Sequence, residues 1–302
     1  MKYLSNKILR IDLSSEKFQE EIIEEEILRK FVGGCALGAK ILYDEVLPNI
    51  NWDDHGNRLI LLGGQLSGTK IPGSGGFSVS TKGAMTNGAA STQAQGVFGA
   101  YLRMCGFLGL VIHGKASNWR YLVIREDGFA ELKDAEHLVG KDTWETYDTI
   151  AKTPEFYRQK ISSLSIGPAG ENRVRFACIC ADKGHIAAHN GVGAVMGSKK
   201  LKAIVVIKSK SKIHVKDHVR VKEISKSILQ RLINNKSSYY YYGTIPAFHK
   251  NYEVGNLPVK NYKSSKWEIS KKKFNEFSGE HIVSRYSPQR KRPCWSCPNR
   301  HS

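Results

Sequence analysis

The sequence contains no long hydrophobic run. Its apolar stretches stay well short of the roughly 20 residues that a membrane-spanning helix requires. Residues 1–7 lead directly into a strand pattern and not into the apolar core of a signal peptide. We therefore expect a protein of the cytoplasm with no membrane association.

Cysteine is also scarce, with six residues in a chain of 302. In a chain of this size without a secretion signal, so few thiols do not indicate a disulfide framework. Cys35 and Cys105 each stand alone in a helical setting near glycine, where we expect a small buried thiol. Cys178 and Cys180 lie two residues apart in an expected strand, so both should face one side and pack in the core.

Acidic residues are nearly missing from the last third of the chain. Residues 1–198 hold 22 basic and 22 acidic residues, so the totals of 46 and 28 leave 24 basic and 6 acidic residues for 199–302, which is the whole formal charge of +18. This break predicts a domain boundary, which we place at residue 210. A basic segment makes nucleic-acid binding an alternative function. Basic runs such as 271–273 are more often solvated surface, or surface that meets an acidic partner, so nucleic-acid binding is the lowest-ranked hypothesis.

Strand-like and helical runs alternate through the first 210 residues, and a hydrophobic content of 41% is enough for a core. The expected strands are residues 8–13, 58–62, 76–81, 108–113, 121–125, 129–133, 161–166, 174–180 and 203–208. The expected helices are residues 24–31, 36–46, 97–104, 143–152 and 219–233. The pattern predicts an α+β, sheet-dominated domain over residues 1–210, followed over 211–302 by the start of a helical domain, and it shows no internal repeat.

Residues 165–204 form the most informative segment. Its glycines flank strand-like and helical runs and stand at positions 167, 170, 191, 193 and 197. Glycine lets the main chain approach a ligand without a Cβ atom and direct N–H groups at anionic oxygens. The block therefore predicts a site for a bulky phosphorylated cofactor; the alternative is that these glycines only turn the chain.

A C-x-x-C-P motif, Cys294 to Pro298, stands close to residue 302. Two thiolates at this spacing reach one metal centre, and the proline shapes the ligand loop, as in many iron–sulfur sites. A 4Fe-4S cluster needs two further ligands, and the other four cysteines lack suitable spacing. His301 follows Cys297 by four residues and is the candidate third ligand; the alternative is a free, reducible cysteine pair.

Taken together, seven ordered segments resemble the tungsten-dependent aldehyde:ferredoxin oxidoreductase family. The resemblance covers nearly the whole chain, as the amino-terminal half of that enzyme. The segments are GGCALGAK (33–40), GQLSGT (64–69), GVFGAYLR (96–103), GPAGEN (167–172), GAVMGSK (193–199), YGT (242–244) and LPVKNY (257–262), all ahead of the C-x-x-C-P motif.

The resemblance implies a first domain of two related β-sheets with short helices, which forms a base under a tungsten (or molybdenum) bis-pyranopterin with magnesium at its phosphates. It also implies a 4Fe-4S cluster that passes electrons to ferredoxin or a dedicated subunit, a small aldehyde as substrate, and a homodimer as one option. By analogy, the pterin-contacting positions are Gly76, Gln93, Gln95, Gly96, His189, Asn190, Gly191 and Gly193.

This chain also departs from the family pattern. The family often has arginine at the positions of Gly76 and His189 and asparagine at Gln93, so two positive charges near the cofactor phosphates are missing. Its third cluster cysteine falls at His301. The residues that the family uses for proton transfer lie in its other half, so no catalytic residue is assigned here.

The leading hypothesis is the N-terminal half of a tungsten (or molybdenum) pterin oxidoreductase that oxidises an aldehyde to a carboxylic acid. The alternative is a truncated, catalytically inactive relative that binds the cofactor or a partner.

Overall fold

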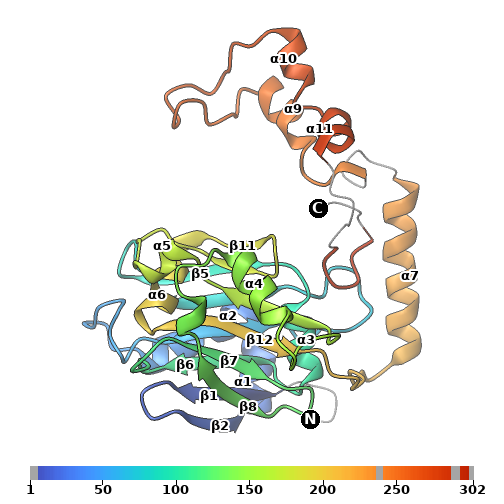
Figure 1. Ribbon diagram of the computed structural model, residues 1–302. Coiled ribbons are helices and arrows are strands. Elements are labelled where there is room, and N and C mark those ends of the chain that lie inside the picture. The colour runs from blue at the N-terminus through green and yellow to red at the C-terminus, as the bar shows by residue number, and fades with distance from the viewer. Residues whose placement is uncertain (1–5, 236–240, 287–292, 299–302) are drawn as a thin grey trace.

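The computed structural model describes residues 6–235, 241–286 and 293–298, and two mixed six-stranded sheets form its base. Figure 1 shows the two sheets packed together, with a helical segment that rises from one side of them. The first sheet, in the order β2-β1-β6-β3-β4-β5, consists of β1 (Lys7–Asp12), β2 (Lys17–Ile22), β3 (Leu59–Gly63), β4 (Phe77–Lys82), β5 (Ala89–Ala94) and β6 (Gly109–His113). The second, in the order β11-β10-β9-β12-β7-β8, consists of β7 (Arg120–Ile124), β8 (Ala130–Asp134), β9 (Ile161–Ser165), β10 (Ile179–Ala181), β11 (His185–Ala187) and β12 (Leu201–Ile207).

The two sheets repeat one topology. Each begins with an antiparallel hairpin, β1-β2 or β7-β8, whose first strand pairs in parallel with the last strand, β6 or β12. That last strand pairs with an antiparallel trio, β3-β4-β5 or β9-β10-β11. The fold therefore confirms the α+β class with two related sheets, and residues 7–113 and 120–207 form a structural repeat that sequence inspection did not detect.

Helices cover the outer faces of the sheets, and the inner faces pack on each other. Helices α1 (Glu25–Phe31) and α2 (Gly34–Glu45) bury a cluster with the first sheet, and α4 (Thr143–Ala151) does so with the second. The central cluster joins inner-face residues of both sheets, such as Leu61 and Leu164. Successive side chains of a strand point to opposite faces of the sheet, and here both faces are buried, which gives this layering.

Short helices close the repeats. They are η1 (Glu136–Leu138), α5 (Pro168–Glu171) and η2 (His189–Gly191), and, after the fifth strand of each half, α3 (Phe98–Met104) and α6 (Val192–Ser198). Both α3 and α6 contribute to the central cluster, through residues such as Phe98 and Met196. Each helix therefore holds the loop that precedes it in place. The loop after β5 and the loop after β11 lie at equivalent positions of the repeat.

The expected strand over 174–180 is wrong in its first part. Only β10 is a strand there, because Ala177 N–H donates to the Val174 carbonyl oxygen (2.8 Å) and closes a turn. Cys178 precedes the strand and is half-buried, whereas Cys180 is in the strand and is buried. The two cysteines therefore do not share a strand face.

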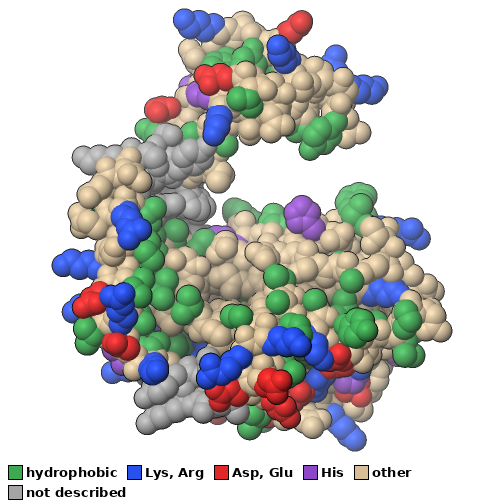
Figure 2. Space-filling model, turned by 180° about the vertical axis from the view of Figure 1, so that it is seen from behind, with side chains coloured by type: hydrophobic (Ala, Val, Ile, Leu, Met, Phe, Trp, Pro, Cys, Tyr) green, Lys and Arg blue, Asp and Glu red, His purple; other side chains and the backbone are tan. Residues whose placement is uncertain are grey.

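The elements described after β12 are helices and one isolated bridge, Val259 with Ser264. The helices are α7 (His218–Asn234), α9 (Ala247–Glu253), α10 (Lys271–Asn275) and α11 (Gly279–Tyr286). Helices α9, α10 and α11 stand apart from the base, and the space-filling view shows an open gap between them and the base (Figure 2). The division into domains at residue 210 stays a prediction. Over the described ranges, the helices lack the combination of length and apolar character needed to cross a bilayer.

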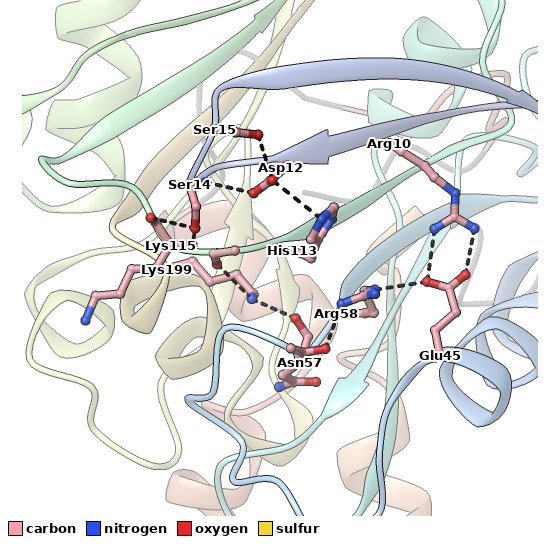
Figure 3. Close-up of polar contacts among 12 residues, drawn as sticks. Arg10, Asp12, Ser14, Ser15, Glu45, Asn57, Arg58, His113, Lys115 and Lys199 are labelled. Carbon is pink, nitrogen blue, oxygen red and sulfur yellow. Dashed lines mark hydrogen bonds and ion pairs between the residues drawn. The ribbon is translucent and has the colours of Figure 1, made fainter.

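A buried lysine ties the two halves together. Lys199, at the turn between α6 and β12, is 2% exposed, and its Nζ donates to the carbonyl oxygens of Asn57 (2.7 Å) and Gly114 (3.2 Å) (Figure 3). Burial, followed by the charge of Arg58, lowers the pKa of Lys199 to about 7. Keeping Lys199 in its charged ammonium form in the core therefore lowers the stability of the folded state.

Replacing Lys199 with methionine should flatten the pH dependence of stability. Between about pH 7 and the usual lysine pKa of 10.5 the unfolded chain holds this proton and the folded chain does not, so wild-type stability should rise with pH. The slope is up to about 1.4 kcal/mol per pH unit, and the penalty is fully present below pH 7. Urea unfolding from pH 7 to 9 should show the advantage of Lys199→Met over wild type shrinking by about 2 kcal/mol. A constant difference, like that expected for the exposed Lys216→Met, would contradict this.

Candidate functional site

A pocket of about 170 Å³ opens in the first half of the base, where β3 ends, β4 begins and β5 ends. Three of the eight predicted cofactor positions, Gly76, Gln93 and Gln95, share it. Its other lining residues come from the start of α2 and from β3 to β5: Gly34, Cys35, Leu62, Gly64, Phe77, Ser78 and Ala94. The structure thus joins the predicted loop to two glycine segments that carried the family resemblance without being assigned to the site.

Two of the lining glycines face free space. A Cβ atom added at Gly64 would meet no atom within 4 Å, and one added at Gly34 would meet only the Ser78 Oγ, at 3.9 Å. These positions form a cradle that any larger side chain would fill. Because neither position carries a side chain, a ligand can approach the main chain closely there.

The start of α2 adds hydrogen-bond donors to this pocket. Its N-cap residue is Gly33, which offers no side-chain acceptor, and the first turn has no acidic residue. The N–H groups of that turn have no partner within the helix, and the helix dipole makes its N-terminus favourable for an anion. By contrast, α4 in the second half is closed by the Asp142 and Glu145 capping box. The pocket residues therefore fit a phosphorylated heterocycle.

Cys35 is exposed and lines the pocket, so the prediction that it is a buried thiol was wrong. It stands in the first turn of α2, outside the row of Leu37 and Ile41 that packs on the sheet. Cys105 is buried as predicted; its Sγ donates to the Ile207 carbonyl oxygen (3.2 Å), and burial raises its pKa to about 12.

The second predicted loop lies next to the first but outside this pocket. His189 N–H donates to Thr92 Oγ1 of β5 (3.3 Å between nitrogen and oxygen). Thr92 and Gln93 are neighbours in a strand and face opposite sides, so His189 lies across β5 from the pocket. His189 is exposed, and Asn190 packs at Gly83, where an added Cβ would lie 2.8 Å from its carbonyl oxygen. The roles of His189 and Asn190 as pterin contacts stay predictions.

Close backbone packing accounts for most glycines of the 165–204 block. An added Cβ would lie 1.9 Å from a carbonyl oxygen at Gly191 (Arg175) and Gly197 (Gly170), 2.3 Å at Gly193 (Cys178) and 3.1 Å at Gly170 (Gly193). All four glycines are buried. Their size lets α6 pack directly on α5 and on the chain before β10, which is a packing role that the ligand interpretation left out. Gly191 and Gly193 as cofactor contacts stay predictions.

The cysteine loop, residues 293–298, lies against the base beside the pocket. Trp295 N–H donates to the Gly96 carbonyl oxygen (2.9 Å), and Gly96 directly follows the pocket residue Gln95. Trp295 Nε1 also donates to the Thr69 carbonyl oxygen (2.8 Å), and its ring packs edge-on against Tyr101 at 6.2 Å between centroids. Gly96, predicted as a cofactor position, thus anchors the cysteine loop.

Inside this loop, Cys294 is buried and Cys297 is half-buried. Burial raises the pKa of the Cys294 thiol, and the Cys297 N–H donates to the Cys294 carbonyl oxygen (3.0 Å). Sequence reasoning missed His185, whose Nδ1 lies 3.9 Å from Cys294 Sγ and whose ring packs on Gly96. No motif signalled it, since its position depends on how β10 and β11 pair.

The described residues do not complete a ligand set for an iron–sulfur cluster. The cysteine loop supplies two thiols, Cys294 and Cys297, whereas a 4Fe-4S cluster takes four ligands. Within residues 6–235, 241–286 and 293–298, no group of three or more His, Cys, Asp or Glu side chains is arranged to hold a metal ion. His301 lies outside the described residues.

A duplicated two-sheet base with a glycine-lined pocket and an adjacent cysteine loop defines a cofactor-binding base domain. Residues 8–208 match the family model for the aldehyde ferredoxin oxidoreductase, N-terminal domain. The chain belongs to this family, as its seven segments predicted.

Similar proteins match over nearly the whole chain. The tungsten-containing aldehyde ferredoxin oxidoreductase of Pyrococcus furiosus is 35% identical over 295 residues, which are 97% of this chain and 47% of the relative. The aliphatic sulfonate oxidoreductase, WOR-like subunit, of the same organism is 31% identical over 85% of this chain and 43% of its own length. The chain therefore spans about half the length of the curated relatives it matches.

A solved structure shares the fold. The active-site complex BamBC of benzoyl coenzyme A reductase, in complex with 1,5-dienoyl-CoA, superimposes with a TM-score of 0.83 at 25% identity, over 99% of this chain and 46% of that one. The match extends beyond residues 8–208 of the family model, so it includes the helical segment and the cysteine loop.

Proposed function

We propose that this chain is the N-terminal, cofactor-binding part of a tungsten (or molybdenum) pterin oxidoreductase that oxidises an aldehyde to a carboxylic acid. The observation that carries this proposal is the pocket of Gly34, Gly64, Gly76, Gln93 and Gln95 in a chain aligned over 97% of its length with tungsten-containing relatives. When bound, the cofactor would supply the two-electron redox chemistry.

In this proposal the chain's own residues bind and orient the cofactor. The first-turn N–H groups of α2 would donate hydrogen bonds to its phosphate oxygens, and magnesium would add positive charge there. The side-chain amides of Gln93 and Gln95 offer both donors and acceptors to a pterin ring. A volume of about 170 Å³ is below the roughly 300–1,000 Å³ of sites that enclose a whole ligand, so this pocket would hold one part of the cofactor.

The cysteine loop would carry electrons away from this site. Cys294 and Cys297 would be two of the cluster ligands, with His301 as a candidate third, and the hydrogen bond from Trp295 to Gly96 places their loop one residue from the pocket. We infer ferredoxin or a dedicated electron-transfer subunit as the acceptor, because the relatives are named ferredoxin oxidoreductases.

A second candidate function has its own observation. In the part that the structure describes, the cysteine loop holds only two cysteines. A relative that binds the cofactor or a partner without catalysis fits this fact. The relatives also differ in the substrates that their names state, so the aldehyde rests on the most similar ones.

Cofactor content distinguishes these functions. The chain should be produced together with the adjoining coding sequence in a host that makes pterin cofactors, with tungstate and molybdate supplied. We expect pterin, iron and either tungsten or molybdenum in the purified protein, together with aldehyde-dependent reduction of a viologen dye. Pterin and metal without dye reduction would favour the non-catalytic function. A protein free of pterin, tungsten and molybdenum would overturn the oxidoreductase and the cofactor-binding relative, and would leave only a relative that binds a partner.

A further inference from the structure

A second pocket, of about 320 Å³, lies at the other end of α3 from the cofactor pocket. It is formed by the end of α3, the turn between β7 and β8, and the segment that leads toward α7. Its lining residues are Arg103, Met104, Cys105, Gly106, Glu126, Asp127, Ser211, Lys212, Ile213 and His214. This volume is within the range typical of small-molecule sites.

Arg103 is the residue that points to a ligand here. Its Nε atom is buried and has no hydrogen-bond partner, and the guanidinium makes no hydrogen bond or ion pair with the described residues. Burial lowers the pKa of Arg103 to about 10, with no nearby carboxylate acting against it. Arg103 as a whole is half-buried and lines the pocket, and its buried Nε donor has no partner among the described residues. A buried donor left unsatisfied is costly, and a ligand in the pocket would satisfy it.

Among the residues that the structure describes, the charged groups around Arg103 do not offset this cost. Lys212 and His214 add basic groups to the pocket wall. Asp127 accepts a hydrogen bond from Phe129 N–H (3.0 Å), so its carboxylate closes the turn, and Glu126 is exposed. Neither carboxylate forms an ion pair with Arg103.

We propose that this pocket binds a small oxyanion, a phosphate or a carboxylate, whose charged group lies against Arg103 and Lys212. A guanidinium presents a planar fork of donors that matches such groups with two parallel hydrogen bonds. Because residues 211–214 form one wall and precede α7, the ligand would also fix this segment to the base. The site does not depend on the proposed redox function.

Titration of the whole chain with inorganic phosphate, and separately with acetate, tests this site at constant ionic strength by calorimetry. The affinity for the preferred anion should fall at least about tenfold in Arg103→Gln and partly in Arg103→Lys, which keeps the charge but loses the fork. Arg29→Gln removes the same charge from exposed α1 and should bind as wild type does. Glu126→Gln should bind at least as tightly, since it removes a like charge from the pocket.

The two anions identify the source of the ligand. Tighter binding of phosphate supports a phosphorylated ligand, and tighter binding of acetate supports a carboxylate. Equal affinity in Arg103→Gln and wild type would overturn the site, as would no binding of either anion. Without anion, Arg103→Gln should unfold at a temperature no lower than wild type, since it removes a half-buried charge whose Nε has no partner among the described residues. A clear loss of stability would mean that Arg103 already has a partner in the chain.

Discussion

Replacing Gly197 with alanine should remove a large part of the stability of this fold. The added Cβ would lie 1.9 Å from the carbonyl oxygen of Gly170 and 2.7 Å from its carbonyl carbon. Both are backbone atoms of α5, so no side chain can rotate away. Relief requires α6 to leave the central core, where Val195 and Met196 are fully buried. We expect a loss of about 4 kcal/mol or more, above the usual cost of overpacking, out of the roughly 5–15 kcal/mol of an ordinary domain.

Gly184→Ala is the matched control for this change. Gly184 is exposed in the turn between β10 and β11, and a Cβ added there would meet no atom within 4 Å. The same substitution should change the free energy of unfolding by less than about 1 kcal/mol. Urea unfolding of both variants compares them directly, and similar midpoints would mean that α6 does not pack on α5 as closely as described.

Strands with long apolar runs could be predicted from the sequence, and two strands without them could not. Strands β3 and β12 are apolar nearly throughout and buried along their length, so both were expected within two residues of their ends. Strand β2 is mostly exposed and contains two glutamates, and β5 is built of Ala, Ser, Thr and Gln. Neither was expected, because their residues have low strand propensity and little apolar alternation. The missed β5 is the strand that places Gln93 in the pocket.

The repeat was hidden because strand pairing, and not side-chain identity, is what the two halves share. The parallel pair β1-β6 corresponds to β7-β12, although one half places a capping box where the other has an uncapped glycine. Only this correspondence shows that the loop at Gln95 and the loop at His189 are equivalent connections, each leading from a fifth strand into a helix. A single sequence contains no direct record of such pairing.

Glycines in similar sequence segments of this chain have different structural roles. Gly197 and Gly64 both stand in glycine-rich segments of the family pattern, yet one packs against backbone and the other faces free space. The many glycines of residues 165–204 predicted a cofactor site there, but backbone packing explains most of them. The open glycines lie in the less conspicuous segments 33–40 and 64–69. The free space around a glycine, which only the fold defines, separates the two roles.

Replacing Gly64 with leucine should therefore abolish cofactor binding while the fold survives. A side chain at this position meets no protein atom within 4 Å of its Cβ and would extend into a pocket of only about 170 Å³. The protein should keep its wild-type unfolding midpoint, because no buried group is displaced. The added side chain would occupy space that the ligand needs, at a cost of about 3 kcal/mol or more, which is at least a roughly hundredfold loss of affinity.

Gly184→Leu provides the control, since it places the same side chain in free space outside the pocket. Pterin and tungsten or molybdenum, measured per mole of purified protein, should stay at the wild-type level in Gly184→Leu and fall to trace amounts in Gly64→Leu. This comparison depends on the proposed function, but it separates whether the protein binds the cofactor from whether the cofactor lies in this pocket. If wild type and Gly64→Leu hold the same amount of cofactor, the proposed function stands and the pocket is the wrong site. A ligand between Gly64 and Gln95 would leave no room for the four added carbons.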